Sequence, residues 1–235
     1  MNGLYIAAAG AASQLHQLET VTSNLSNAAT PGFRRFIAVL RAVSGNASPF
    51  QYATAEAGTL DLTQGPIRST GNPFDVAITG PAFLTLDTPQ GPAYTRNGEL
   101  QLAPDGTLMA AGHPVMGSNG APLRVGPGPI TVATDGSVEA GNIPAGRIGL
   151  ADPAGIAMES MGGSLYRAAN GAPLPAVTGS ASQLHQGFVE GSTGSEVGEM
   201  VSLMSVMRSY EAAMHSVQSI DENQDRAIQA FTLQG

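Results

Sequence analysis

The 235-residue chain contains no cysteine, no tryptophan and no lysine. Without cysteine it can form neither a disulfide nor a cysteine-ligated metal site. Aromatic residues make up only 5% of the chain, so its cores must consist mainly of aliphatic side chains and methionine. All ten basic residues are arginines, and acidic residues outnumber them to give a net charge of -8. We expect no nucleic-acid binding, because that function needs a basic surface to neutralise phosphates.

Long apolar runs are also missing. No segment approaches the ~18 consecutive apolar residues of a membrane-spanning helix, so we expect no direct membrane insertion. The weakly apolar segment 6–12 has no basic residue before it and continues into an amphipathic pattern, unlike a secretory signal. If the chain leaves the cytoplasm, we therefore expect export without a cleaved signal peptide.

Motifs for catalysis and cofactor binding are lacking as well. The four histidines do not have the mutual spacing of metal ligands. No P-loop, dinucleotide-binding or serine-hydrolase motif occurs. The acidic pair Asp221–Glu222 lies in a long acidic segment, where carboxylates usually form a solvated face. We expect no catalytic site, no metal and no cofactor.

The C-terminal segment from Glu196 to Phe231 is free of proline and has a regular apolar pattern. Its apolar residues recur with the alternating three- and four-residue spacing of a heptad seam. The pattern predicts a helix about 54 Å long, at ~1.5 Å per residue. Thr193 and Glu196 have the spacing of a capping box, with Ser195 as a rival cap. The expected seam consists of Met200, Leu203, Met207, Tyr210, Met214, Val217, Ile228 and Phe231, with a polar layer at Asp221 and Gln224.

The N-terminal segment carries a matching seam and predicts a helix over residues 3–29. The turn Thr30-Pro31-Gly32 ends the pattern, because proline disfavours helix in the residue before it. Neither helix can bury its own apolar stripe, so we expect the two to pair. A hairpin covering a sheet and a coiled-coil-like layer that also packs on other copies both fit, and the helix length favours the layer. The N-terminal seam consists of Leu4, Ala8, Ala11, Leu15, Leu18, Thr22 and Leu25.

The middle of the chain has a different pattern. Asn-Gly and Asp-Gly pairs recur there, separated by short alternating segments such as 74–78, 99–102, 130–132 and 148–150. Such segments predict short strands joined by tight hairpins. Residues 34–43 fit either a short helix or a strand. We expect an α+β protein with a terminal helical domain (1–43 and 190–235), a small-residue linker (44–59) and a central all-β domain (60–189) that forms a sandwich or irregular barrel.

Several motifs resemble one protein family. The turn after the first helix, Ser23 to Arg34 (SNLSNAATPGFR), is similar to the signature of the bacterial flagellar rod and hook family. Segments 199–201, 208–211 and 219–222 resemble the C-terminal pattern of that family. Segments 74–80, 93–98 and 113–117 resemble the β-domain of its rod members. The resemblance spans nearly the whole chain and is greatest to the proximal rod protein, with the distal rod protein as the alternative.

The resemblance implies a structural subunit of the flagellar basal-body rod, which crosses the periplasm. It also implies passage through the flagellar export apparatus and helical assembly with itself and other rod subunits to transmit torque. We expect the assembly interface to be the two apolar seams without Thr22. The turn residues implied by the motif are Asn24, Asn27, Thr30, Pro31, Gly32 and Phe33.

A different class of function also fits the pattern. A secreted β-sandwich binding module could use the helices only as an oligomerisation stalk. Exposed aromatic side chains on one face of a sheet would favour this alternative, because they form platforms for ligands such as carbohydrates. The candidates are Phe74, Phe83, Tyr94 and Tyr166. A cell-wall hydrolase would need a pair of carboxylates in a cleft, and no motif indicates one.

Overall fold

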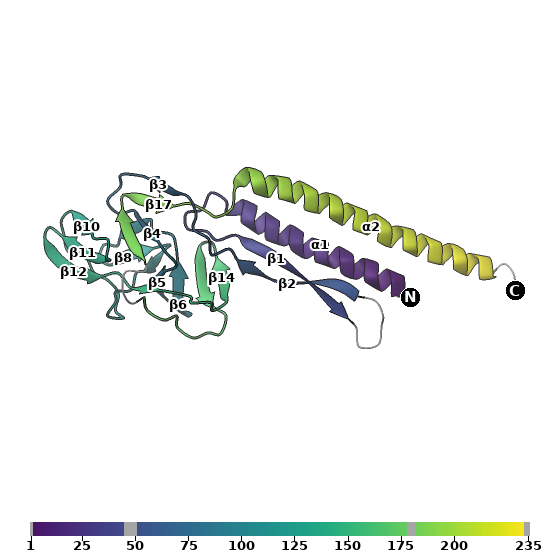
Figure 1. Ribbon diagram of the computed structural model, residues 1–235, viewed down its shortest axis with the longest axis horizontal. Coiled ribbons are helices and arrows are strands. Elements are labelled where there is room, and N and C mark those ends of the chain that lie inside the picture. Colours follow the sequence, from purple (N-terminus) through teal and green to yellow (C-terminus); the bar gives the residue numbers. More distant parts are fainter. Residues whose placement is uncertain (1, 45–50, 178–181, 233–235) are drawn as a thin grey trace. The chain divides into compact units, whose positions relative to one another are not determined.

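The computed structural model describes residues 2–44, 51–177 and 182–232. The described residues form a helix at each end of the chain and antiparallel strands between them, which confirms the expected α+β class (Figure 1). Neither helix has, within these residues, a run long and apolar enough to span a bilayer. The helices are α1 (Asn2–Ser26) and α2 (Glu196–Thr232). The strands are β1 (Phe36–Ser44), β2 (Gln51–Leu60), β3 (Ile67–Ser69), β4 (Val76–Thr79), β5 (Phe83–Thr88), β6 (Gly91–Thr95), β7 (Leu100–Leu102), β8 (Leu108–Ala110), β9 (His113–Pro114), β10 (Ile130–Val132), β11 (Ser137–Ala140), β12 (Ile143–Arg147), β13 (Leu150–Ala151), β14 (Met158–Gly162), β15 (Leu165–Ala168), β16 (Gln183–Gln186) and β17 (Phe188–Glu190).

The chain divides into two compact units. The helical unit contains residues 1–26, 36–59 and 196–235, and the β unit contains residues 27–35 and 60–195. These ranges differ from the expected domain boundaries at two places. The β1–β2 hairpin belongs with the helices, and the segments next to α1 and α2 belong with the β unit.

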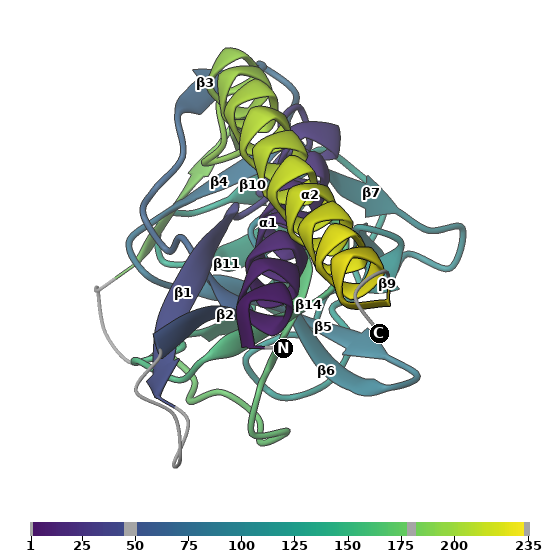
Figure 2. The same ribbon diagram turned by 90° about the vertical axis from the view of Figure 1, so that its right-hand side faces the viewer.

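In the helical unit, α1 and α2 lie side by side and run in opposite directions (Figures 1 and 2). The two-stranded sheet of β1 and β2 packs on α1 through β1. The buried side chain of Asn24, in the last turns of α1, fixes the start of this sheet. Its amide donates to the carbonyl oxygen of Phe36 (2.9 Å) and its Oδ1 accepts from the Phe36 N–H (2.8 Å). One side chain therefore satisfies both backbone groups of the first residue of β1.

The β1–β2 hairpin decides between helix and strand for residues 34–43, and it corrects the linker expected over residues 44–59. Residues 36–44 form a strand, so the strand alternative for 34–43 holds. The linker expected over 44–59 is wrong for residue 44, which ends β1, and for residues 51–59, which belong to strand β2; residues 45–50 lie outside the described residues. The small residues of this segment suggested a linker, but β1 supplies the hydrogen-bonding partner that makes the segment a strand.

The β unit consists of small antiparallel sheets. The largest has five strands in the order β13-β5-β6-β15-β14, and β7-β8-β9 and β10-β11-β12 form two three-stranded sheets. The expected strands near 76, 100, 130 and 150 appear as β4, β7, β10 and β13. A large apolar core includes Ile78, Leu84 and Leu108, and a smaller one contains Phe83 and Tyr166 packed edge to face at 6.0 Å.

The last strands of the β unit pair with its first strands. β16 pairs with β4, and β17 pairs with β3. Just beyond β17, the Thr193 hydroxyl accepts a hydrogen bond from the Arg35 N–H (2.9 Å), and the Thr193 N–H donates to the Phe33 carbonyl (3.1 Å). The expected Thr193–Glu196 capping box is therefore wrong: α2 begins at Glu196, which places Ser195 at the cap position.

Candidate assembly surface and buried charge cluster

Helix α2 has two different apolar faces. Half-buried side chains form one face, which includes Leu203, Tyr210, Met214 and Val217. The other is a row of five apolar side chains that are between 46% and 72% exposed. We call this row the outward stripe. It consists of Val197, Met200, Val201, Met204 and Met207.

The outward stripe divides the seam expected from the sequence. Met200 and Met207 were expected to lie in one seam with Leu203 and Tyr210, but the structure places them on the exposed face. Val197 and Val201 were not expected in the interface, and Met204 was expected only as one of the methionines that adapt to neighbouring subunits. Their spacing of three and four residues was visible, but a heptad pattern does not show which of two adjacent apolar rows faces the partner helix.

Helix α1 is covered over a wide arc, because α2 and β1 both contact it. Ala11 is buried and Leu18 and Leu25 are half-buried, whereas Ala8 and Leu15 are exposed. The expected seam therefore lies at the border between the covered and exposed sides of this helix. The side chains of Leu4, Ile228 and Phe231 lie outside the described part of the structure.

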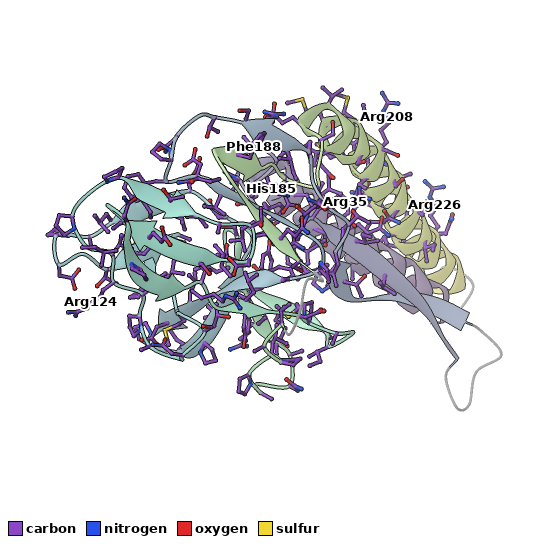
Figure 3. The ribbon with its side chains drawn as sticks, turned by 60° about the vertical axis from the view of Figure 1, so that its left-hand side comes forward. Arg35, Arg124, His185, Phe188, Arg208 and Arg226 are labelled. Carbon is purple, nitrogen blue, oxygen red and sulfur yellow. The ribbon has the colours of Figure 1, made fainter. Side chains whose placement is uncertain are left out.

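The apolar part of the exposed α2 face ends after Met207. Beyond it the exposed side chains that the structure describes, apart from Ala212, are polar or charged and include Arg208, Glu211, Gln218 and Glu222. Figure 3 shows Arg208 and Arg226 projecting away from the helix, and Arg226 pairs with Glu222 at 3.4 Å. The outward stripe thus occupies about 16 Å of helix, at ~1.5 Å per residue.

The β unit contains a buried charge cluster of Arg34, Arg96 and Glu190. The Glu190 carboxylate accepts hydrogen bonds from Arg34 (2.7 Å), Arg96 (3.0 Å) and the Gly65 N–H (2.8 Å). Backbone carbonyl oxygens accept further guanidinium hydrogen bonds. Arg34 donates to Thr63 (2.6 Å), and Arg96 donates to Ile78 (3.0 Å) and to Gly80.

Two cations and one anion leave this cluster with a net positive charge. Burial lowers the pKa of Arg96 to about 10, although the nearby Glu190 carboxylate opposes the shift. Arg96 therefore remains charged at neutral pH, and its guanidinium lies 5.1 Å from the centre of the Phe83 ring. Ions buried in this way are costly to leave unpaired. The arrangement makes Glu190 the residue on which both arginines depend.

The cluster was not expected from the sequence. Arg34 and Arg96 lie in segments that resemble the family, but no pattern indicated that they share Glu190 as a partner. In the structure, Arg96 follows the last residue of β6 and Glu190 is the last residue of β17. The partners are separated by 156 and 94 residues in sequence, so no local pattern pairs them.

The turn after α1 docks directly onto the cluster. Within the turn, Thr30 donates its N–H to the Asn27 carbonyl (2.9 Å) and Phe33 donates to Thr30 (3.2 Å). The Gly32 N–H donates to the Glu190 carbonyl (2.8 Å). Gly32 has a φ of +68°, and a Cβ placed there would overlap backbone atoms of the Arg96–Asn97 peptide. Only glycine fits this position, because both the conformation and the space exclude a side chain.

We expect Gly32→Ala to lower the free energy of unfolding of the β unit by about 2–4 kcal/mol, since left-handed strain and a steric clash add together. Gly171→Ala is a matched control, because Gly171 has the same φ of +68° and open space where a Cβ would lie. In the control, the free energy of unfolding should fall by only about 1–2 kcal/mol, the cost of the left-handed conformation alone. Urea unfolding measures both values, and equal losses would show that the contact with the Arg96–Asn97 peptide is unimportant.

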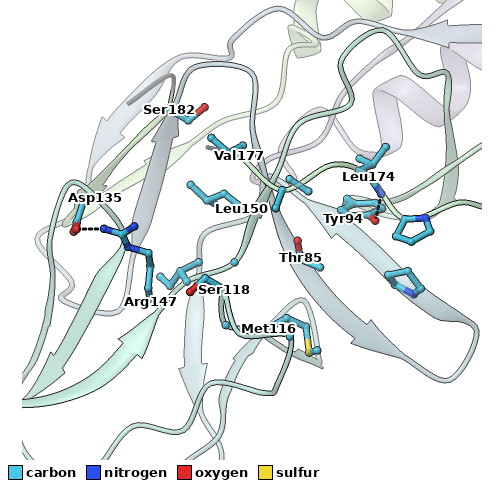
Figure 4. Close-up of a pocket in the computed structure, with 18 of the residues that line it drawn as sticks. Thr85, Tyr94, Met116, Ser118, Asp135, Arg147, Leu150, Leu174, Val177 and Ser182 are labelled. Atoms are coloured by element: carbon cyan, nitrogen blue, oxygen red, sulfur yellow. Dashed lines mark hydrogen bonds and ion pairs between the residues drawn. The ribbon is translucent and has the colours of Figure 1, made fainter. Parts of the chain in front are cut away.

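The β unit also contains a cavity of about 560 Å³ (Figure 4). Asp135 and Arg147, the charged side chains that line it, pair with each other. A backbone hydrogen bond from Ser137 and then the Arg147 hydrogen bond lower the pKa of Asp135 to about 2. At the other side of the cavity, the Tyr94 hydroxyl accepts a hydrogen bond from the Leu174 N–H (2.7 Å). Asp135, Arg147, Tyr94 and Leu174 are thus engaged with partners within the cavity lining.

None of the four aromatic residues named as candidates for a carbohydrate-binding platform is exposed in the β unit. Phe83, Tyr94 and Tyr166 are buried, and Phe74 is half-buried against the core. Burial raises the pKa of Tyr166 to about 12, and its hydroxyl accepts a hydrogen bond from the Arg34 N–H (2.6 Å). These four side chains therefore belong to the core and do not form the exposed platform that would favour a binding module.

Comparisons with known proteins agree with the resemblance at both ends of the chain and along its length. Residues 4–34 match the model of the flagella basal body rod protein family, and residues 185–230 match that of the flagellar basal body rod FlgEFG protein C-terminal region. FlgF of Salmonella typhimurium LT2, a flagellar basal-body rod protein, is 34% identical over a gapped alignment of 251 positions that covers 99% of each chain. FlgF of Caulobacter vibrioides CB 15 is 32% identical and covers 97% of each chain. FlgG of Buchnera aphidicola from Schizaphis graminum is 29% identical over 93% of this chain and 95% of its own, so the distal-rod alternative has weaker support. The chain therefore belongs to the FlgF family of flagellar basal-body rod proteins.

Proposed function

We propose that this protein is a structural subunit of the proximal flagellar rod, and that its copies assemble with one another and with other rod subunits through the terminal helices. The observation that carries the proposal is the outward stripe. Five apolar side chains stay exposed on α2 of a chain that is similar to FlgF over its whole length. Contiguous exposed apolar surface of this kind marks a binding surface.

In the proposed assembly, the α1–α2 pair forms a coiled-coil-like layer with neighbouring copies. Head-to-tail contacts between unlike surfaces would extend helically and would not close into a dimer. The three methionines of the outward stripe suit such contacts, since their flexible side chains adapt to non-equivalent neighbours. The exposed seam residues Ala8 and Leu15 of α1 are the proposed second contact.

The buried charge cluster has a mechanical role in this proposal. Arg34 lies just before β1 and Glu190 lies just before α2, so the cluster holds together the two chain segments that lead into the helical unit. A subunit that transmits torque needs such fixed attachments. We propose a purely structural protein without catalytic activity, placed in the basal body and delivered by the flagellar export apparatus without a cleaved signal peptide.

Locating the protein in basal bodies tests the proposal. Cells whose only copy of the chain carries a small epitope tag would be used, and antibody-labelled basal bodies would be imaged by electron microscopy. We expect the label on the rod. Label confined to the export apparatus or to the outer rings, in cells that still swim, would contradict a rod subunit.

A further inference from the structure

The methionines of the outward stripe differ from the others in the described residues. Met200, Met204 and Met207 are 48%, 58% and 46% exposed. Met158 in the β unit is only 8% exposed, and the remaining described methionines are half-buried. The three exposed sulfurs also lie on one side of α2, at spacings of four and three residues. These three methionines are therefore more accessible to an oxidant in solution than any other described methionine.

We propose that Met200, Met204 and Met207 form a modification site for peroxide, and that their oxidation in the free chain blocks assembly. The inference rests on the proposed function, because it concerns the same surface. In the reaction, the sulfur lone pair attacks one oxygen of hydrogen peroxide. An S–O bond forms, the O–O bond breaks, and the departing hydroxide takes the proton of the transferred oxygen to become water. The thioether loses two electrons and the peroxide gains them.

The product changes the property on which the surface depends. A sulfoxide is polar and accepts hydrogen bonds, whereas the thioether is apolar. A neighbouring subunit that covers the stripe would remove water from up to three such oxygens without replacing their hydrogen bonds. Oxidation of the free chain therefore opposes assembly, and assembly in turn shields the sulfurs from peroxide. Because the sulfoxide can be reduced back to the thioether, the block is reversible.

Two triple variants separate polarity from the loss of sulfur. Met→Gln at positions 200, 204 and 207 places a polar oxygen on a side chain of similar length, whereas Met→Leu at the same positions keeps the surface apolar and removes the sulfur. Methionine, leucine and glutamine have similar helix propensities, so α2 itself should tolerate both changes. Each variant would replace the wild-type gene in a motile strain, and the purified full-length wild-type chain would be treated briefly with hydrogen peroxide.

In the treated wild-type chain, peptide mass spectrometry should find the three stripe methionines oxidised at least about ten times faster than Met158, as exposure dictates. The Met→Leu cells should build rods and swim, whereas the Met→Gln cells should do neither. Equal oxidation of Met158, swimming Met→Gln cells, or non-motile Met→Leu cells would each overturn the inference. Wild-type chain that is absent from rods would instead overturn the proposed function, and the inference with it.

Discussion

Replacing Glu190 with glutamine lowers the free energy of unfolding of the β unit by about 3–5 kcal/mol in our expectation, the usual cost of breaking a buried ion pair by removing one partner. Glutamine keeps the shape of the side chain but removes the negative charge. Arg34 and Arg96 would then be two buried cations without a carboxylate. In the wild type the Glu190 carboxylate raises the pKa of Arg96 against the effect of burial, and Glu190→Gln removes this stabilisation of the buried cation.

Denaturant unfolding at pH 7 measures this loss, and Glu159→Gln is its control. Glu159 also pairs with an arginine of the β unit, Arg167, at 2.9 Å, but both side chains are about half exposed. Removal of an exposed pair costs less than about 1 kcal/mol. If the two variants lost equal stability, burial of the cluster would not be the reason for its importance.

Met207→Asp should abolish rod assembly and swimming but leave the free energy of unfolding of the β unit at its wild-type value. Met207 is 46% exposed on the outward stripe, so the isolated chain tolerates a carboxylate there. In an assembled rod the same carboxylate would be covered, and a buried charge without a partner costs several kcal/mol. Leu15→Asp on the exposed side of α1 should have the same effect through the second proposed contact.

Gln218→Asp is the matched control for Met207→Asp. Gln218 is exposed on the same side of α2, eleven residues or about three turns further along, where the surface is already polar. Both changes introduce aspartate into the same helix and share its small propensity cost of less than about 1 kcal/mol. We expect the control cells to swim. Swimming of the Met207→Asp cells would remove the outward stripe from the assembly interface.

The sequence was sufficient where structure depends on near neighbours in the chain. The two terminal helices follow from apolar spacing and from the absence of proline, and the glycine-rich turns indicated the strands between them. The signature that includes Thr30, Pro31 and Gly32 indicated the family, and the comparisons confirm it. These features are local, so a linear pattern contains the information that specifies them.

Only the tertiary structure decided what these elements contact. The residues of β2 resemble a linker until β1 pairs with them, and the Thr193 hydroxyl receives a hydrogen bond from Arg35 instead of capping α2. The same holds for the two apolar rows of α2, of which one faces α1 and the other faces outward. The Arg34–Arg96–Glu190 cluster is the extreme case, because three distant segments must fold together before the charges meet. Periodicity along a chain specifies that an apolar face exists, whereas packing in three dimensions determines which face is covered and which charges are paired.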